Sequence, residues 1–167
     1  RGIATHLPVW NAAECLQCNM CSFVCPHAVI RPFLLDEGEV KAAPVDMTLV
    51  DAKGPGLAGL KYTMGVSTLD CTSCGSCVAS CPKSGKALKM VPTHEVSLDQ
   101  TDWNFLTTVK EKTSRVDKFT LKGSQFKQPM LEFSGSCAGC AETSYARLIT
   151  QLFGDHMYIL SLIHISE

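Results

Sequence analysis

Eight of the ten cysteines in this chain fall into two copies of one spacing pattern. Each copy reads Cys-x2-Cys-x2-Cys-x3-Cys-Pro, and the two runs occupy residues 15–26 and 71–82. Bacterial proteins ligate 4Fe-4S clusters through cysteine thiolates at this spacing. Because the first three cysteines of a run lie close together, one loop can hold three irons of one cubane. The doubled run therefore predicts two 4Fe-4S clusters.

The fourth cysteine of each run directly precedes a proline that turns the chain away from the loop. In proteins with two such clusters, this cysteine ligates the cluster of the other run. We therefore predict that each cluster takes three ligands from one run and one from the other. The first ligand set is Cys15, Cys18, Cys21 and Cys81, and the second is Cys71, Cys74, Cys77 and Cys25.

Two other uses of clustered cysteines explain the pattern less well. A zinc site usually takes its four ligands in two separated pairs, so the third and fourth cysteines of each run would be surplus. A disulfide framework is typical of secreted chains shorter than about 100 residues, whereas this chain has 167 residues. Iron-sulfur ligation is the interpretation that uses all eight cysteines.

Composition and charge narrow the class of protein further. The chain is long enough for one ordinary domain, or for a small domain and part of another. Its formal net charge of -1 provides no basic field, so we expect no nucleic-acid partner. It contains neither an apolar run of about 18 residues nor a signal peptide, so we expect no membrane partner. The many thiols indicate a reducing compartment: the cytoplasm, or an anaerobic organelle in a eukaryote.

Strands and short helices must position the two runs. The segments 28–35, 61–68 and 86–92 have the patterns of strands, and residues 1–14 predict a short extended segment. Loop, short helix and strand thus follow one another twice, which predicts an α+β fold of the two-cluster ferredoxin type. Prolines and glycines punctuate the rest of segment 36–68, which predicts loops that pack on another part of a larger protein.

The second half of the chain contains fewer sequence patterns that predict secondary structure. Residues 97–118 predict a surface helix, because Ser97 to Gln100 has the form of a capping box and apolar residues follow at roughly helical spacing. The polar segment 122–129 then predicts a linker and a domain boundary.

The remaining cysteines, Cys137 and Cys140, form a third candidate site. Apolar residues at helical spacing follow them up to Gly154, which suits a helix C-terminus. We therefore expect the pair at or just before a helix N-terminus, where the helix dipole favours thiolates. By itself, one Cys-x2-Cys is compatible with a zinc half-site, a redox-active dithiol or half of the ligands of a third cluster.

Several stretches together resemble the pyruvate:ferredoxin (flavodoxin) oxidoreductase family. They are RGIA, PVWN, CLQCNMCSFVCPHAVIRPFLL, LDCTSCGSCVASCP and QPMLEFSGSCAGCAET. The PHAVIRPFLL and CAGC-x-E stretches separate the chain from ordinary ferredoxins. The family usually has glycine where Ala141 stands here.

The resemblance implies a fragment of an enzyme that is inactive by itself. Family members decarboxylate pyruvate on thiamine diphosphate with Mg2+, pass the acetyl group to coenzyme A, and send electrons through three 4Fe-4S clusters to ferredoxin or flavodoxin. The intact enzyme is expected to be a homodimer. Motif matching makes Cys137 and Cys140 partial ligands of the third cluster and Glu142 a thiamine diphosphate contact. It assigns no catalytic residue to this chain.

The resemblance also implies a division of the chain. Residues 1–124 would form the ferredoxin-like domain, and residues 125–157 the start of an α/β thiamine-diphosphate-binding domain. The resemblance stops there, and residues 158–167 are predicted to be a non-native tail. Because the chain begins with Arg1, we expect it to be a piece of a longer protein.

Two alternatives stay open. A stand-alone two-cluster electron carrier would explain the two runs but leave Cys137, Cys140 and Glu142 without a role. The same domain could also belong to an oxidoreductase for another 2-oxoacid.

Overall fold

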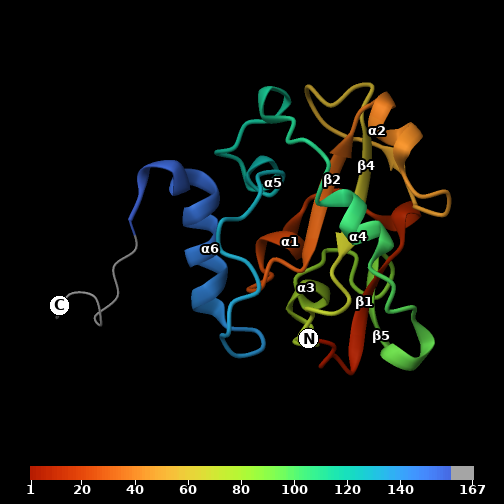
Figure 1. Cartoon of the computed structure of the whole chain (residues 1–167), viewed down its shortest axis with the longest axis vertical. Coiled ribbons are helices and arrows are strands. Elements are labelled where there is room, and N and C mark those ends of the chain that lie inside the picture. Colours follow the sequence, from red (N-terminus) through yellow and green to blue (C-terminus); the bar gives the residue numbers. More distant parts are fainter. Residues whose placement is uncertain (159–167) are drawn as a thin grey trace.

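Two small antiparallel sheets form the centre of the molecule (Figure 1). The computed structural model describes residues 1–158, and the predicted tail 158–167 lies outside them except for its first residue. One sheet pairs β1 (His6–Trp10) with β5 (Leu88–Pro92). The other has the order β2 (Ile30–Leu35), β4 (Lys61–Val66), β3 (Val50–Asp51). The strands predicted after each cysteine run, and before the second, are thereby confirmed.

The strand pairing brings the two cysteine runs together. Strand β1 precedes the first run and pairs with β5, which follows the second run, with Trp10 opposite Leu88. Strand β2 follows the first run and pairs with β4, which precedes the second, with Ile30 opposite Val66. Short helices α1 (Met20–Phe23) and α3 (Ser76–Ala79) lie within the runs and contact each other. Each run is therefore held between the ends of strands from both sheets.

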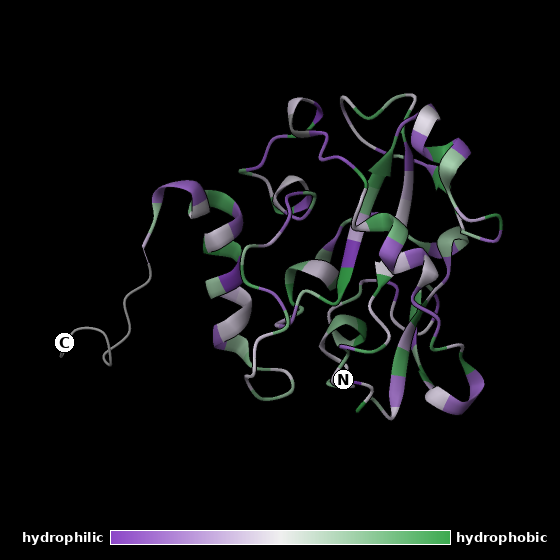
Figure 2. Cartoon of the chain, in the orientation of Figure 1, coloured by the Kyte–Doolittle hydropathy of each residue, from purple (hydrophilic) through white to green (hydrophobic). Residues whose placement is uncertain are grey.

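The main core lies between the sheets and includes cysteines of both runs. Strand β2 is mostly green, and hence apolar, in Figure 2. Burial of apolar surface at about 25 cal/mol per Å² is the main force that holds such a small body together. The most buried members are Leu7, Cys25, Val29, Ile30, Leu34, Leu57, Leu60, Tyr62, Met64, Cys71, Cys77 and Leu88.

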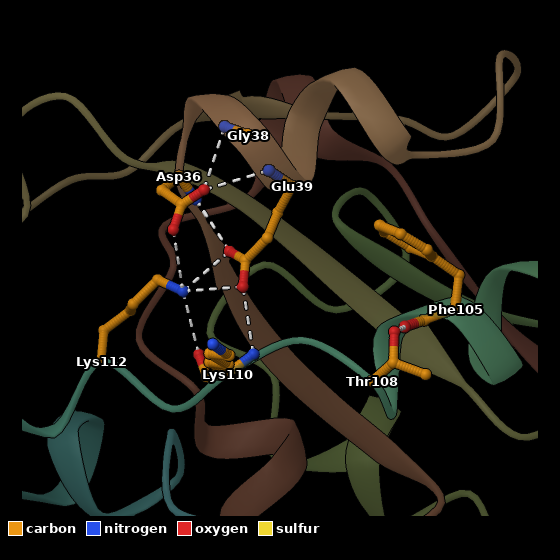
Figure 3. Close-up of polar contacts among 7 residues, drawn as sticks. All are labelled: Asp36, Gly38, Glu39, Phe105, Thr108, Lys110 and Lys112. Carbon is orange, nitrogen blue, oxygen red and sulfur yellow. Dashed lines mark hydrogen bonds and ion pairs between the residues drawn. The ribbon is translucent and has the colours of Figure 1, made fainter.

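The excursion between the runs has more regular structure than its composition predicts. It contains α2 (Glu37–Ala42), which begins with a capping box in which Asp36 Oδ1 accepts hydrogen bonds from the Gly38 and Glu39 backbone N–H groups, both at 3.0 Å. The Lys112 ammonium then lies 2.7 Å from Glu39 Oε2 (Figure 3). These elements of the excursion therefore pack on this chain itself.

The helix expected over residues 97–118 is much shorter. Ser97 Oγ accepts from the Asp99 N–H and caps a turn rather than a helix, and α4 spans only Thr101–Leu106. The Thr108 hydroxyl donates to the Phe105 carbonyl at 2.7 Å, where the helix ends (Figure 3). The charged stretch beyond it pairs with α2 and carries only the 3-10 turn η3 (Thr113–Arg115). The residues after α4 thus form tertiary ion pairs instead of the continued helix that their local spacing predicted.

Segment 122–129 is not an exposed linker. It overlaps α5 (Leu121–Ser124), and Gln125, which caps that helix, is 1% exposed. Helix α6 (Ala141–Phe153) follows after a loop, contacts α5 and ends at Gly154 as expected. The Gln125 side chain is buried because its amide group hydrogen-bonds to Ser22 of α1 and to Arg147 and Gln151 of α6, and composition does not reveal such distant partners.

Three further 3-10 turns complete the described part of the chain: η1 (Ala12–Glu14), η2 (Thr93–Glu95) and η4 (Gly154–His156). No helix within residues 1–158 has both the length and the apolar character to cross a membrane.

Candidate cofactor sites

The structure gathers the cysteines of the two runs around two cavities. Each cavity has a volume of about 20 Å³. Each is lined by three cysteines from one run and the fourth cysteine of the other. The first is lined by Cys15, Cys18, Cys21 and Cys81, and the second by Cys25, Cys71, Cys74 and Cys77. These are the two groupings that the spacing predicts.

Both cysteine loops have the same backbone shape. The residues two and four positions after the first cysteine adopt left-handed conformations: Gln17 and Asn19 in the first loop, Ser73 and Gly75 in the second. Left-handed backbone costs an L-residue about 1–2 kcal/mol, and only glycine adopts it freely. Three of the four positions therefore need compensating contacts.

The excursion supplies these contacts to the first loop. Gln17 Nε2 donates to the Asp51 carbonyl at 2.8 Å, and its Oε1 accepts from the Lys53 N–H at 2.7 Å. The Tyr62 hydroxyl donates to Asn19 Oδ1 at 2.9 Å. Because all of these partners lie within residues 51–62, the excursion holds the first cysteine loop in its strained shape.

Strand β1 supports the second loop. Ser73 Oγ accepts from the His6 N–H at 2.9 Å and donates to the His6 carbonyl at 2.6 Å. Gly75 has no neighbour within 4 Å of the position that a Cβ would take. The second loop thus needs fewer side-chain contacts, because glycine replaces the asparagine of the first.

Burial of the thiols determines which species they can bind. Desolvation raises the pKa of Cys21, with the nearby Cys77 adding to the shift. Desolvation also raises the pKa of Cys77 to about 12, and the charges of Cys25, Cys74 and Cys71 contribute. Such thiols ionise only when a positive centre compensates their charge, so metal binding here would release protons. The influence of Cys25 on Cys77 agrees with their common cavity.

Unpaired polar atoms at the cavities test whether an iron-sulfur cluster fits. Trp10 Nε1 in the first cavity, and His27 Nε2 and Thr72 Oγ1 in the second, are buried without a hydrogen-bond partner among residues 1–158. An unpaired buried donor is costly, whereas cluster sulfurs accept hydrogen bonds. Cavity walls with four thiols and unpaired donors therefore fit a sulfur-rich anion.

A single metal ion fits less well. Within the part of the chain that the structure describes, no three His, Cys, Asp or Glu side chains are close enough to hold one ion. Zinc requires ligands at about 2.0–2.3 Å from the metal. The four thiols of each cavity are instead spread around its wall, which disfavours the zinc alternative.

The third cysteine pair lies outside both cavities. Cys140 is the N-cap of α6 and Cys137 is exposed in the loop before it, so the expected position at a helix N-terminus is confirmed. The Thr143 hydroxyl and N–H lower the pKa of Cys140. Glu142 is exposed in the first turn of α6. The intervening Gly139 packs beside Cys74, which connects this pair to the second cavity.

Several residues that support these sites belong to no sequence motif. Sequence reasoning missed Gln17, Tyr62, His27 and Arg147, because each acts through a contact with a distant segment. The left-handed Asn19 had a usable signal, since it occupies the position of Gly75 in the other copy.

Comparison with known proteins agrees with the arrangement of the cysteines. The model of the 4Fe-4S dicluster domain matches residues 14–88. The chain is 51% identical over 160 residues to the pyruvate:ferredoxin oxidoreductase of Moorella thermoacetica, and 50% identical over 159 residues to the pyruvate-flavodoxin oxidoreductase of Klebsiella pneumoniae. Each match covers 95% of the chain. Over almost its whole length, the chain is thus similar to a part of these two oxidoreductases.

This similarity confirms the resemblance found in the sequence, and the matching model confirms the ferredoxin-type dicluster domain. It extends to proteins with another name, since the chain is also 47% identical over 160 residues to the pyruvate dehydrogenase (NADP+) of Cryptosporidium parvum. The chain spans only 14%, 13% and 8% of the lengths of these three relatives. It therefore corresponds to a small part of each.

Proposed function

We propose that this chain is the electron-transfer segment of a pyruvate:ferredoxin (flavodoxin) oxidoreductase. Its two cavities would each hold one 4Fe-4S cluster, on Cys15, Cys18, Cys21 and Cys81 in the first and on Cys71, Cys74, Cys77 and Cys25 in the second. Clusters of this type take up and release single electrons. The observation that carries the proposal is the grouping of the eight thiols into two sets of four, each drawn from both runs.

The surroundings of the cavities suit this role. Tyr62, Met64 and Leu88 shield the first cavity, and Val29 and Ile30 shield the second. Apolar walls exclude water, and solvent exposure is one of the factors that set a cluster's potential. The chain itself would therefore hold the thiolates, keep water out and donate hydrogen bonds from the unpaired polar atoms.

The relative position of the three cysteine groups supports a direction of transfer. Gly139, between Cys137 and Cys140, packs beside Cys74 of the second cavity. The first cavity reaches the surface at Leu16, which is 53% exposed. We propose that electrons enter on the side of the third pair and leave on the side of Leu16, toward ferredoxin or flavodoxin.

The remaining features of the enzyme belong to the same proposal. Cys137 and Cys140 would provide part of the ligands of a third cluster, and Glu142 would contact thiamine diphosphate bound with Mg2+. Residues 125–157 would begin the domain that binds this cofactor. Pyruvate and coenzyme A would be the substrates of the intact enzyme, which would act as a homodimer. The lowered pKa of Cys140 and its place at a helix N-terminus support a thiolate at this position.

Anaerobic reconstitution tests the central assignment. The chain should bind iron and sulfide sufficient for two 4Fe-4S clusters and give the paramagnetic resonance of two interacting centres after reduction. Cys25→Ala should impair the second cluster and Cys81→Ala the first, although each residue lies in the other run. As a control, Cys137→Ala should leave both clusters in place. Preferential binding of zinc, or full cluster content in both Cys25→Ala and Cys81→Ala, would contradict the proposal.

A further inference from the structure

Arg147 on helix α6 is the largest fully buried side chain among residues 1–158. Its Nη2 donates to the carbonyl oxygens of Ser22 at 2.8 Å and Phe23 at 2.7 Å. Its Nη1 donates to Gln151 Oε1 at 2.8 Å and Gln125 Oε1 at 3.1 Å. The guanidinium thus joins α6 to the last turn of α1.

That turn carries Cys25. The Ser22 carbonyl that accepts from Arg147 also accepts from the Cys25 N–H, at 3.1 Å. Cys25 is the one cysteine of the first run that lines the second cavity. Arg147 therefore holds the backbone turn that directs this thiol toward the other three.

The charge of Arg147 has no carboxylate partner. Within residues 1–158, no Asp or Glu forms an ion pair with it, and all of its acceptors are carbonyl or amide oxygens. The neighbouring buried arginine, Arg31, is different, since Glu132 Oε2 lies 2.5 Å from its Nη2. Burying a charge without a counter-charge is strongly unfavourable, so an anion nearby is the expected compensation.

The guanidinium remains charged in this position. Burial lowers the pKa of Arg147 to about 10, the charge of Cys25 opposes this shift and Arg31 adds to it. A pKa of about 10 leaves the side chain protonated near neutral pH. Cys25, whose charge opposes the shift, is a residue of the second cavity.

We propose that Arg147 is a positioning residue of the second cavity and supplies the positive charge that favours reduction of the cluster held there. This inference rests on the proposed function. Four thiolates outweigh the positive charge of a 4Fe-4S core, so the bound cluster is an anion, and each electron that it accepts makes it more negative. A fixed positive charge in a low-dielectric interior stabilises the more negative state, and net charge is one of the factors that set cluster potentials.

The test is a potentiometric titration of the reconstituted full chain, monitored by electron paramagnetic resonance, together with iron analysis. Arg147→Met removes the positive charge. Arg147→Lys keeps the charge but replaces the planar guanidinium group with a single ammonium group. Arg115→Met is the matched control, because Arg115 also donates to two carbonyls, of Gly56 at 2.6 Å and Ala58 at 2.8 Å, but is exposed at the end of the 3-10 turn η3.

We expect Arg147→Met to shift one of the two reduction steps to lower potential, Arg147→Lys to stay close to the unmodified protein, and Arg115→Met to change neither step. If Arg147→Met does not bind the second cluster but Arg147→Lys does so at an unchanged potential, the charge is still required and the proposal stands.

Three results would overturn it: unchanged potentials in Arg147→Met with both clusters bound, an equal shift in Arg147→Lys, or loss of the second cluster from both variants. The first two exclude an effect of charge, and the third makes the guanidinium a requirement for folding. Absence of clusters from the unmodified chain would instead contradict the proposed function.

Discussion

Gly139 packs directly against Cys74. A Cβ at position 139 would lie 3.4 Å from the Cys74 Cβ and 3.6 Å from Ser76 Oγ, and the backbone of Gly139 is left-handed with φ +72°. The loop between Cys137 and Cys140 therefore lies beside the second cysteine run. A Cβ at this position would make ordinary contacts with these atoms, so the left-handed backbone is what opposes a larger residue.

Gly139→Ala should consequently destabilise the protein by about 1–2 kcal/mol, the usual cost of a left-handed L-residue. Gly135→Ala is the matched control, because its Cβ would meet no atom within 4 Å and its backbone is not left-handed. Denaturant unfolding of the two variants measures the difference. Equal stability of the two variants would show that the left-handed backbone at position 139 carries no such cost.

Gln17 is predicted to hold the first cysteine loop closed. Gln17→Ala removes both amide hydrogen bonds to the excursion and leaves the partner groups of Asp51 and Lys53 unsatisfied, which should cost about 1–3 kcal/mol. The first cluster should then be lost faster to an iron chelator than the second, as followed by the decay of visible absorption. Gln128→Ala, at an exposed glutamine, is the control and should change neither property. Equal rates of cluster loss in the two variants would argue against this role.

Trp10 is predicted to donate a hydrogen bond to the cluster in the first cavity, because its Nε1 is buried there without a partner among residues 1–158. Trp10→Phe removes this donor and should lower the potential of that cluster by an amount on the order of tens of millivolts, the equivalent of one hydrogen bond for a single electron. Trp103→Phe, at a buried tryptophan of α4, is the control. A redox titration in which both variants match the unmodified protein rules the donor out.

Lys112 is predicted to attach the excursion to the chain that follows α4. Its ammonium lies 2.7 Å from Glu39 Oε2 and 3.4 Å from Asp36 Oδ2, and it is mostly buried (Figure 3). Lys112→Met leaves the partly buried Glu39 carboxylate without its cation and should cost about 1–3 kcal/mol. Lys86→Met, at an exposed lysine, should be close to neutral. Thermal unfolding distinguishes the two, and similar midpoints would contradict the prediction.

The spacing of the cysteines was sufficient to predict which thiols line each cavity, because ligand geometry within a loop is local. The crosswise grouping of Cys25 and Cys81 also followed from the pattern, since it accompanies a doubled run. Strands β2 and β5 were predictable for a related reason. Each follows a short helix in the repeated unit, and the apolar residues of each indicate a buried strand. The start of α6 after Cys140 was likewise evident from helical spacing.

The tertiary structure alone decided what surrounds those sites. The short α4 and the buried Gln125 contradict local signals, because ion pairs with α2 and hydrogen bonds to α1 and α6 outweigh intrinsic helix or linker preference. Gln17 and Arg147 look like ordinary polar residues in the sequence. Their roles depend on partners 36 and 125 residues away. Such roles arise only when folding brings distant backbone groups within hydrogen-bond distance, so no local pattern encodes them.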